Sequence, residues 1–337
     1  MLELTINSKS PAAITAALKK IKEMASTGSI KKTDPVHIIL EAGEYRELVR
    51  YNSSIPLIME AAPGVKPEDC RVLADNCESF HSGAENRAVV VFGPNCTSVT
   101  LRGFSIINEH KKSGETEAAL SDAAEAFFWN NTSGTLCAEF LRLEGRQNTI
   151  NLKGFTFFKN CYISGDVDFI YGDVDTSLFE HCQIYMREDN RGDFNAYAVK
   201  SMALANRPGF LFSECKFTGE KRKKSSLYIA RTLGRGSVLM PKYWDSIALI
   251  KCTVGENFNP EFIWDDDMSL TIYPRGNAKT GFREYGTKNL LKDGSTLDAE
   301  TGARNIKSYT MTEDDYYRLY ASRYLMLQDT PLARFAE

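Results

Sequence analysis

The chain has 337 residues, of which 43% are hydrophobic and 25% are charged, a composition typical of a soluble globular protein with a large core. The formal charge of −3 gives no reason to expect nucleic-acid or membrane-surface binding, and no apolar run reaches the roughly 18 residues of a membrane-spanning helix. Residues 1–6 lack the basic and apolar regions of a signal peptide, so we expect a cytoplasmic protein, or a secreted one if a signal has been removed from the chain.

The first predicted element is an amphipathic helix over about residues 11–25. Ser10 is expected to cap its first turn, and Pro11 suits the first helical position. Apolar residues recur at helical spacing on one face, namely Ile14, Leu18, Ile21 and Met24. If the coils that follow form a solenoid, this helix is expected to cover the exposed terminal coil.

Short strand patterns with one cysteine each recur through the middle of the chain. The cysteine and its apolar neighbours alternate with polar residues around Cys161, Cys182, Cys215 and Cys252. Repeated strands at irregular intervals are typical of a solenoid whose coils carry loops of different lengths. The repeats therefore predict an all-β fold, a parallel β-helix over about residues 36–285 with stacked cysteines. A β-sandwich would need frequent hairpin signals, and only Asp293-Gly294 is of that kind.

The eight cysteines of the chain include no Cys-x-x-Cys pair and have no histidine cluster beside them in the sequence. A chain of this length with a large core does not need disulfides. We therefore expect buried free thiols and no metal site.

The C-terminal part of the chain, about residues 286–337, is predicted to be a tail rather than further coils. Thr312 precedes three acidic residues, as at the start of a helix. We expect this helix to pack back along the solenoid, so that residues 1–337 form a single domain.

One carboxylate lies inside an apolar run. Residues 167–170 read Val-Asp-Phe-Ile, and Gly165 and Gly172 flank them. The run predicts a short buried or half-buried strand. A carboxylate in such a place is unfavourable unless it is paired or hydrogen-bonded, and groups placed in this way are often functional. Asp168 is therefore the first candidate for a site.

This stretch also resembles the signature of the pectin methylesterases, a family of carbohydrate esterases. Four further segments resemble motifs of that family in the same order, at residues 38–47, 147–150, 228–233 and 282–286. The resemblance implies a single-stranded right-handed parallel β-helix of the pectin lyase type. It also implies hydrolysis of galacturonate methyl esters without a metal or another cofactor.

The resemblance assigns roles to three residues. Asp168 matches the nucleophile that attacks the ester carbonyl, and Arg231 matches the arginine that orients it. Gln147 matches one of two glutamines that stabilise the oxyanion.

Two positions depart from the family. Its acid/base aspartate is replaced by Asn148, and its other glutamine, placed here by spacing alone, is replaced by Glu125. An asparagine does not exchange a proton at neutral pH, and an ionised glutamate would repel an oxyanion. We hypothesise that Glu125 acts as the acid/base while Asn148 and Gln147 donate amide hydrogens to the oxyanion. The alternative is a site that has lost catalysis.

The expected substrate contacts also differ from the family. Leu233 stands where the family has a tryptophan that stacks on the sugar. Phe169, Tyr171 and Trp264 are the candidates for an aromatic surface in its place, with the core as the alternative location of each. Asp166 replaces a small neutral residue beside the nucleophile, and we expect it to point to solvent.

Other classes of protein have weaker support. A Ser-His-Asp site needs a mobile histidine, whereas His181 lies in a repeat strand and is expected to face solvent. Residues 265–267, all Asp, suit a glycosidase but are more typical of a solvated turn. A Ca²⁺-dependent lyase would need oxygen ligands that the sequence does not identify. A catalytically silent β-helix that binds a uronide or a protein partner is the main rival.

The sequence thus predicts an intracellular esterase whose substrate is a methyl-esterified oligogalacturonide or a related uronide. Short substrates are expected because a polymer would not reach the cytoplasm. A methyl and an acetyl ester, and any oligomeric state, are equally compatible with the sequence.

Overall fold

The structure is a computed structural model of the chain. It describes residues 2–112, 122–188, 196–220, 227–231, 242–258, 263–265, 276–301 and 308–337, and for Arg231 the backbone alone.

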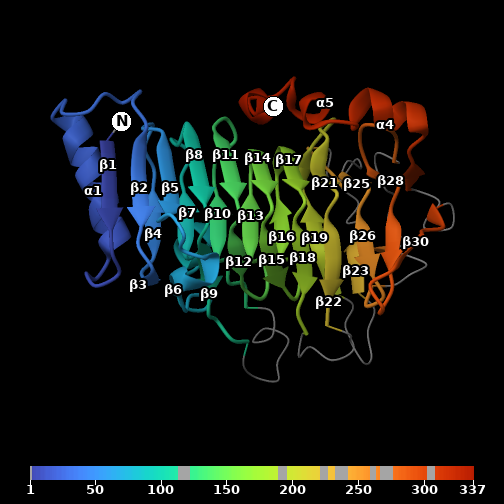
Figure 1. Ribbon diagram of the computed structural model, residues 1–337, viewed down its shortest axis with the longest axis horizontal. Helices are drawn as coiled ribbons and strands as arrows, with labels where there is room; N and C mark the ends of the chain where they lie inside the picture. Colours follow the sequence, from blue (N-terminus) through green and yellow to red (C-terminus); the bar gives the residue numbers. More distant parts are fainter. Residues whose placement is uncertain are drawn as a thin grey trace.

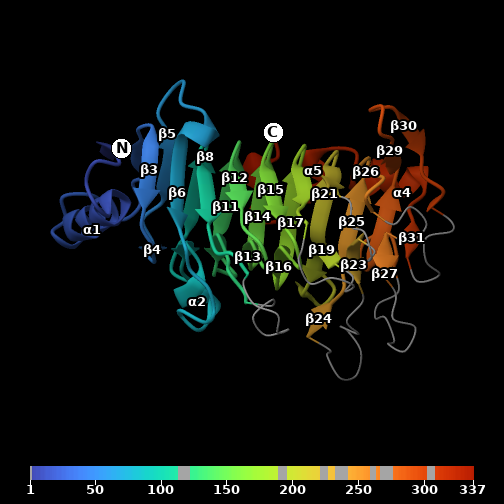
Figure 2. The same ribbon diagram turned by 90° about the horizontal axis from the view of Figure 1, so that it is seen from below.

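Most of the described chain winds through three parallel sheets that run the length of the molecule (Figures 1 and 2). The first sheet contains β1 (Leu2–Ile6), β2 (Val36–Leu40), β5 (Leu57–Ala61), β8 (Ser98–Arg102), β11 (Thr135–Glu139), β14 (Gly154–Lys159), β17 (Val174–Glu180), β21 (Gly209–Ser213), β25 (Ile247–Ile250), β28 (Phe282–Tyr285) and β31 (Tyr309–Thr310). The second sheet contains β3 (Gly43–Arg46), β6 (Cys70–Ala74), β9 (Ser105–Asn108), β12 (Arg142–Glu144), β15 (Tyr162–Gly165), β18 (Gln183–Met186), β22 (Lys216–Gly219), β26 (Thr253–Gly255), β29 (Lys288–Leu290) and β30 (Thr296–Asp298). The third sheet contains β4 (Val49–Tyr51), β7 (Val90–Phe92), β10 (Phe127–Trp129), β13 (Ile150–Leu152), β16 (Ile170–Gly172), β19 (Ala196–Ser201), β23 (Leu227–Arg231) and β27 (Trp264–Asp265).

The remaining elements are short. β20 (Ala203–Leu204) and β24 (Tyr243–Trp244) form an antiparallel pair beside the coils. The helices are α1 (Ala13–Ser26), α2 (Ala84–Arg87), α4 (Glu313–Leu319), α5 (Arg323–Leu327) and the 3₁₀ turns η1 (Pro67–Asp69) and η3 (Ala333–Phe335).

From β2 to β29 each coil visits the first, second and third sheets in turn, and the strands of successive coils pair in parallel; at the C-terminal end β30 pairs antiparallel with β29. This is the single-stranded right-handed parallel β-helix that the sequence predicted. Because neighbours within a sheet come from successive coils, residues that touch are one coil apart in the sequence rather than adjacent.

A single left-handed residue turns the chain from the first sheet into the second. At this corner φ lies between 51° and 53° at Phe140, Asn160, His181, Glu214 and Lys251. The amide of each corner residue donates a hydrogen bond to the next coil, for example from Asn160 to the carbonyl of Glu180 at 3.0 Å. The corner side chains point outward, and His181 is exposed as expected.

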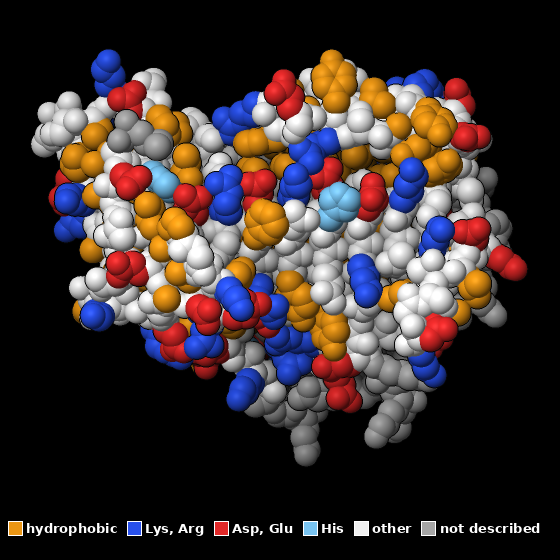
Figure 3. Space-filling view, in the orientation of Figure 1, with side chains coloured by type: hydrophobic (Ala, Val, Ile, Leu, Met, Phe, Trp, Pro, Cys, Tyr) orange, Lys and Arg blue, Asp and Glu red, His pale blue; other side chains and the backbone are white. Residues whose placement is uncertain are grey.

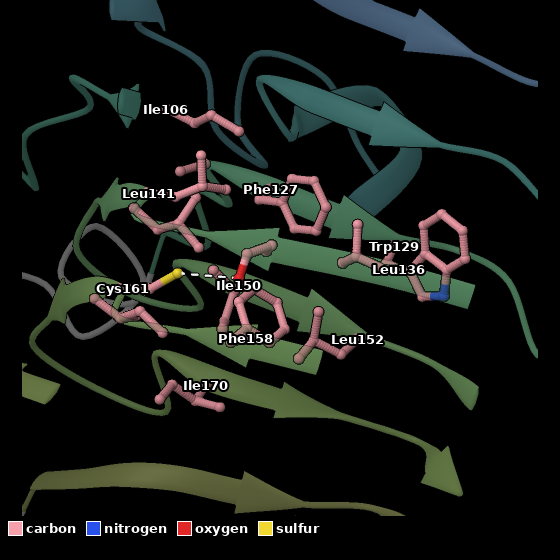
Figure 4. Close-up of a cluster of buried hydrophobic side chains, with 14 of the residues drawn as sticks. Ile106, Phe127, Trp129, Leu136, Leu141, Ile150, Leu152, Phe158, Cys161 and Ile170 are labelled. Carbon is pink, nitrogen blue, oxygen red and sulfur yellow. Dashed lines mark hydrogen bonds between the residues drawn. The ribbon is translucent and has the colours of Figure 1, made fainter. Parts of the chain in front are cut away.

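The core fills the interior between the three sheets, and equivalent side chains stack along it. Phe158, Phe179 and Phe212 stack with ring centroids 4.7 and 4.8 Å apart. Figure 4 shows Ile150 and Ile170 of the third sheet pointing toward the same interior as Phe158 of the first.

The predicted ladder of cysteines is confirmed. Each thiol donates to a carbonyl of the preceding coil, for example from Cys161 to Ala138 at 3.5 Å, and from Cys252 to Phe212 at 3.2 Å. All eight cysteines are free and buried. Burial raises the pKa of Cys70 to about 12, so this thiol is protonated and unreactive at neutral pH.

Helix α1 closes the N-terminal end of the coils, with Ile14, Leu18 and Ile21 buried against them (Figure 1). The predicted cap at Ser10 is wrong, because Ala12 occupies the N-cap position and no side chain of that segment caps the helix. Instead, Glu47 from a neighbouring coil accepts hydrogen bonds from the amide of Ile14 at 2.9 Å. A carboxylate at this end of a helix also interacts favourably with the helix dipole.

The segment after β31 packs back along the outer face of the first sheet, as predicted for the tail (Figure 1), but the predicted end of the coils at residue 285 is wrong, because β29 and β31 still pair in parallel with β26 and β28. Thr312 caps α4 in a reciprocal capping box with Asp315. Tail residues such as Leu327 bury against Phe157 and Leu178 on that face. Figure 3 shows hydrophobic side chains gathered along the upper edge of this view, where the tail lies in Figure 1.

No helix in the described residues is both long enough and apolar enough to cross a membrane.

Candidate active site

The candidate site lies on the third sheet, at its corner with the second. The register of β10, β13 and β16 places Glu125, Asn148 and Asp168 at equivalent positions of three successive coils. Gln147 forms a β-bridge with Val167, directly before the last two of these. The structure therefore brings together four of the residues singled out in the sequence, and it places Glu125 on the coil before Asn148. Figure 2 shows α2 and β24 projecting from this side of the molecule.

Asp168 is at a corner of the chain and not inside a strand, so the predicted strand bounds are wrong. β15 ends at Gly165, and β16 begins only at Ile170. Asp168 has a φ of 46°, and Asn148 has a φ of 62° on the coil before. Asp and Asn tolerate the left-handed conformation better than other residues with a side chain, which explains both residue types at this corner.

The two glycines that flank this run are required by close packing. A Cβ atom on Gly165 would lie 2.2 Å from the Cβ of Phe169. One on Gly172, where φ is 144°, would lie 1.8 Å from the carbonyl oxygen of Leu152. The glycines therefore let the corner fold tightly enough to present Asp168 from a rigid scaffold.

The carboxylate of Asp168 is almost fully buried and lies near the cationic side chain of Lys200. The residue is 8% exposed, and its Oδ2 lies 3.9 Å from Nζ of Lys200. Its amide donates to the carbonyl of Tyr197 at 2.7 Å, which fixes the corner to the next coil. Ala230 pairs with Val199, so Arg231 lies in the same row of the sheet as Lys200. The side chain of Arg231 lies outside the described part of the structure.

Glu125 is fully buried and held by an arginine that the sequence did not point to. Arg87 of α2 donates from Nε to Oε2 at 2.5 Å and from Nη2 to Oε1 at 2.6 Å, a bidentate pair. The hydroxyl of Tyr171 donates to Oε1 of the same carboxylate and accepts from Nδ2 of Asn151 at 2.8 Å. Arg87 also pairs with Glu78, nearer the surface.

This network shifts the pKa values of two of its members. Burial lowers the pKa of Arg87, but its hydrogen bonds to Glu125 and the charge of that group outweigh the effect, and the net pKa is raised. Burial raises the pKa of Tyr171 well above its usual value, and the charge of Glu125 raises it further. The Tyr171 hydroxyl is therefore protonated at neutral pH.

The register of β10, β13 and β16 places Gln147 and Asn148 on the coil between those of Glu125 and Asp168. Both residues are half-buried. Oε1 of Gln147 is buried and has no hydrogen-bond partner among the described residues. Oε1 of Gln147 thus makes no hydrogen bond to the described residues that would stabilise the fold.

Asp166 does not point to solvent, and that expectation is wrong. It is 1% exposed, and its Oδ1 accepts from Nζ of Lys112 at 2.7 Å in a buried ion pair. Arg146 lies 3.9 Å from its other oxygen. Lys112 comes from the coil region 54 residues earlier, which is why the sequence around Asp166 gave no sign of its partner.

Two of the aromatic candidates are in the core, and their proposed role in a binding surface is wrong. Phe169 and Trp264 are both fully buried. Trp264 stacks on Phe282 inside the β-helix with ring centroids 4.8 Å apart. Tyr171 is half-buried between two buried residues of β16 in the third sheet. Leu233 lies outside the described residues.

Of the acidic run at 265–267, only Asp265 is described. It is half-buried and accepts a hydrogen bond from the Tyr197 hydroxyl at 2.5 Å. It therefore belongs to the ordered surface of the third sheet rather than to a fully solvated turn.

Comparison with known proteins agrees with this architecture. A family model described as Pectinesterase matches residues 12–282. Pectinesterase 31 of Arabidopsis thaliana is 30% identical over 209 residues, which cover 58% of this chain and 60% of that protein. Putative pectinesterase 63 of the same plant is 26% identical over 302 residues, which cover 88% of this chain and 76% of that protein. The match to the first of these relatives thus spans about three-fifths of its length.

Solved structures show the same fold. Pectin methylesterase PemA from Erwinia chrysanthemi has a TM-score of 0.69 at 15% identity, with 98% of both chains covered. A pectin methylesterase solved in complex with hexasaccharide VII has a TM-score of 0.69 at 16% identity, again with 98% of both chains covered.

Proposed function

The chain belongs to the pectinesterase family, and we propose on this premise that it hydrolyses the methyl esters of galacturonate units in pectin-derived oligosaccharides. The observation that carries the proposal is the placement of Asp168, a nearly buried carboxylate at a rigid corner, beside Lys200 and directly after the bridge to Gln147. A carboxylate in this setting is suited to nucleophilic catalysis.

The proposed reaction has two steps. One oxygen of Asp168 attacks the ester carbonyl carbon, the bond to the methoxy oxygen breaks, and methanol leaves with a proton from the enzyme. Water then attacks the galacturonyl carbon of the resulting anhydride, gives one proton back to the enzyme, and the bond to the Asp168 oxygen breaks. Asp168 leaves as the free carboxylate, and the galacturonic acid product loses its remaining carboxyl proton to solvent. The amides of Gln147 and Asn148 donate to the oxyanion in both steps.

We assign the proton transfer to the Tyr171 hydroxyl rather than to Glu125 directly. Both oxygens of Glu125 accept hydrogen bonds from Arg87, so neither is left to serve the leaving group. Tyr171 lies three residues after Asp168 and carries its proton at neutral pH. In this role the Tyr171 hydroxyl, whose one proton is donated to Oε1 of Glu125 in the resting site, turns that proton to the methoxy oxygen and regains one from water, and Glu125 accepts it again afterwards.

The roles of Tyr171 and Glu125 are separated by two variants. Tyr171→Phe is expected to lower kcat about 10²- to 10⁴-fold, as for loss of a general acid/base. Glu125→Gln keeps an acceptor for the tyrosine hydroxyl and should lower kcat less. The opposite order of the two effects would return the acid/base role to Glu125.

The activity itself is tested by methanol release from a methyl-esterified galacturonate hexasaccharide. The matched blank is Asp168→Asn, because Asn148 shows that asparagine adopts the corner conformation. Release by the wild type that disappears in the variant supports the proposal. Longer and shorter substrates in the same assay test the preference for oligosaccharides, and an acetylated substrate tests the ester.

A catalytically silent uronide-binding protein remains the second candidate. It is favoured by Asn148 at the family's acid/base position and by the pairing of Glu125 with Arg87. Absence of methanol release, together with a rise in Tm on adding oligogalacturonate, would support this function instead.

A further inference from the structure

Cys77, His110 and Asp122 come from three separate segments and meet beside the candidate site. Their ligand atoms all lie within 4.8 Å of one another. Nε2 of His110 lies 3.3 Å from Oδ2 of Asp122. Two ligands bound tetrahedrally to Zn²⁺ at 2.0–2.1 Å are separated by about 3.3 Å, so this pair already has the spacing of a zinc site.

The histidine is oriented as a metal ligand would be. Its Nδ1 lies 3.0 Å from Oδ1 of Asp75, so the two form a hydrogen bond that leaves Nε2 facing Asp122. A carboxylate on the far side of the ring is the usual support of a zinc-bound histidine. Nε2 and the Asp122 oxygen thus face each other at a spacing that a cation between them would fit.

The cluster of Cys77, His110 and Asp122 is largely buried but remains partly accessible to solvent. Cys77 is fully buried, whereas the side chains of His110 and Asp122 are 10% and 13% exposed. The ring of Phe80 lies edge-on against His110, with centroids 5.6 Å apart. Ser79 donates to Oδ2 of Asp122 at 2.6 Å, which holds that carboxylate toward the cluster. An ion therefore has a path from solvent and a preformed set of side chains to meet.

We propose that Cys77, His110 and Asp122 bind one Zn²⁺ ion, with Asp75 orienting the histidine. A thiolate, an imidazole and a carboxylate together favour zinc over the hard cations Ca²⁺ and Mg²⁺, which take oxygen ligands. Three protein ligands leave a fourth position for water.

The ion would fasten the segments that hold Glu125. Cys77 precedes Glu78, which pairs with Arg87, and Asp122 lies three residues before Glu125. The two segments already meet through the amide of Glu78, which donates to the carbonyl of Ala123 at 2.9 Å. The proposed ion is thus a structural cross-link and takes no part in the ester chemistry. It does not depend on the proposed function.

The test is metal binding by the full chain. The protein is stripped with a chelator and titrated with Zn²⁺ in competition with a chromophoric chelator, and Co²⁺ is added separately to detect a thiolate-to-metal charge-transfer band. We expect one Zn²⁺ per chain, a rise in Tm on binding, and a cobalt band that Cys77→Ser abolishes. Asp75→Asn, which leaves the three ligands in place, is expected to weaken zinc binding about 10- to 100-fold.

Cys96→Ser is the control, because Cys96 is also a buried free thiol but lies outside the cluster. It should bind Zn²⁺ as the wild type does. Zinc binding well below one ion per chain, or equal binding by the wild type and Cys77→Ser, would overturn the proposal. Far-ultraviolet circular dichroism of each variant excludes misfolding, and the Asp75→Asn result stands if Cys77→Ser does not fold.

Discussion

Replacing Arg87 by methionine should destabilise the protein far more than replacing its buried partner Glu125 by glutamine. Arg87→Met leaves the carboxylate of Glu125, which is 0% exposed, with only the Tyr171 hydroxyl as a described partner. Removing one member of a buried pair costs about 3–5 kcal/mol. Glu125→Gln leaves Arg87 paired with Glu78, and the glutamine oxygen still accepts, so we expect a loss of about 1–2 kcal/mol.

These differences are measurable by thermal unfolding. At about 2.1 cal/mol/K per residue, the unfolding entropy of the whole chain is about 0.7 kcal/mol/K. Arg87→Met should therefore lower Tm by about 4–7 °C and Glu125→Gln by about 1–3 °C. In the double variant no charge is left buried and unpaired, so its loss should be smaller than the sum by about 1–3 kcal/mol.

A matched control for the change of charge is Arg102→Met. Arg102 also bridges two carboxylates, those of Glu60 and Glu139, but its side chain is 45% exposed. Surface pairs contribute about 0–1 kcal/mol, so this variant should melt within about 1–2 °C of the wild type. The reasoning about the buried pair is wrong if Arg87→Met has the same Tm as Arg102→Met. It is also wrong if the stability losses of Arg87→Met and Glu125→Gln add up to that of the double variant.

Three further predictions concern other parts of the molecule. Gly165→Ala should lower stability by about 1–3 kcal/mol and abolish methanol release, because its Cβ has no room against Phe169; unchanged Tm and activity would contradict this packing argument. Thr312→Ala should cost about 1 kcal/mol at neutral pH from loss of the helix cap. The backbone hydrogen bond from Thr312 and the neighbouring side chains lower the pKa of Asp315, so its stabilisation is present above the unfolded pKa of about 3.9 and is lost as pH falls through the folded value; Asp315→Asn should therefore lower Tm more at pH 7 than at acid pH. Outside the proposed zinc site at Cys77, a thiol reagent at pH 8 should find no reactive cysteine in the native protein, since burial raises the pKa of thiols such as Cys70 to about 12, whereas all eight should react after denaturation; rapid labelling of other cysteines in the native state would show that the interior opens.

The architecture could be predicted because it repeats. One inward cysteine per coil, with apolar residues at alternate positions, is a local pattern that needs no knowledge of distant contacts. The cap at Thr312 was predictable for the same reason, since its partner Asp315 lies three residues away. The cap of α1 was not, because it comes from Glu47, 33 residues beyond Ile14.

The bounds of the strand at the site were missed for a different physical reason. An apolar run has the same composition whether it forms a straight strand or turns a corner with its side chains inward. Phe169 and Ile170 are buried in both cases, and the position of the turn depends on the left-handed conformation of Asp168. An Asp that follows an apolar residue, with a closely packed glycine four residues later, is compatible with such a corner but does not require one.

The chemistry of the site depends on contacts between coils, and these are the least accessible to sequence. The sequence has a carboxylate at Glu125 and none at the Asn148 position, which led to the hypothesis that Glu125 acts as the acid/base. The role of a carboxylate depends on which cation neutralises it, and here that cation is Arg87, which approaches from a helix outside the coils. Because the coils vary in length, a cation that pairs with a carboxylate on another coil lies at no fixed distance from it in the sequence. Had Glu125 faced Asp168 without a counter-charge, like-charge repulsion would have favoured a proton on one of them, as an acid/base requires. The bidentate pair removes that pressure, which is why we propose the Tyr171 hydroxyl, held by Glu125, for the proton transfer.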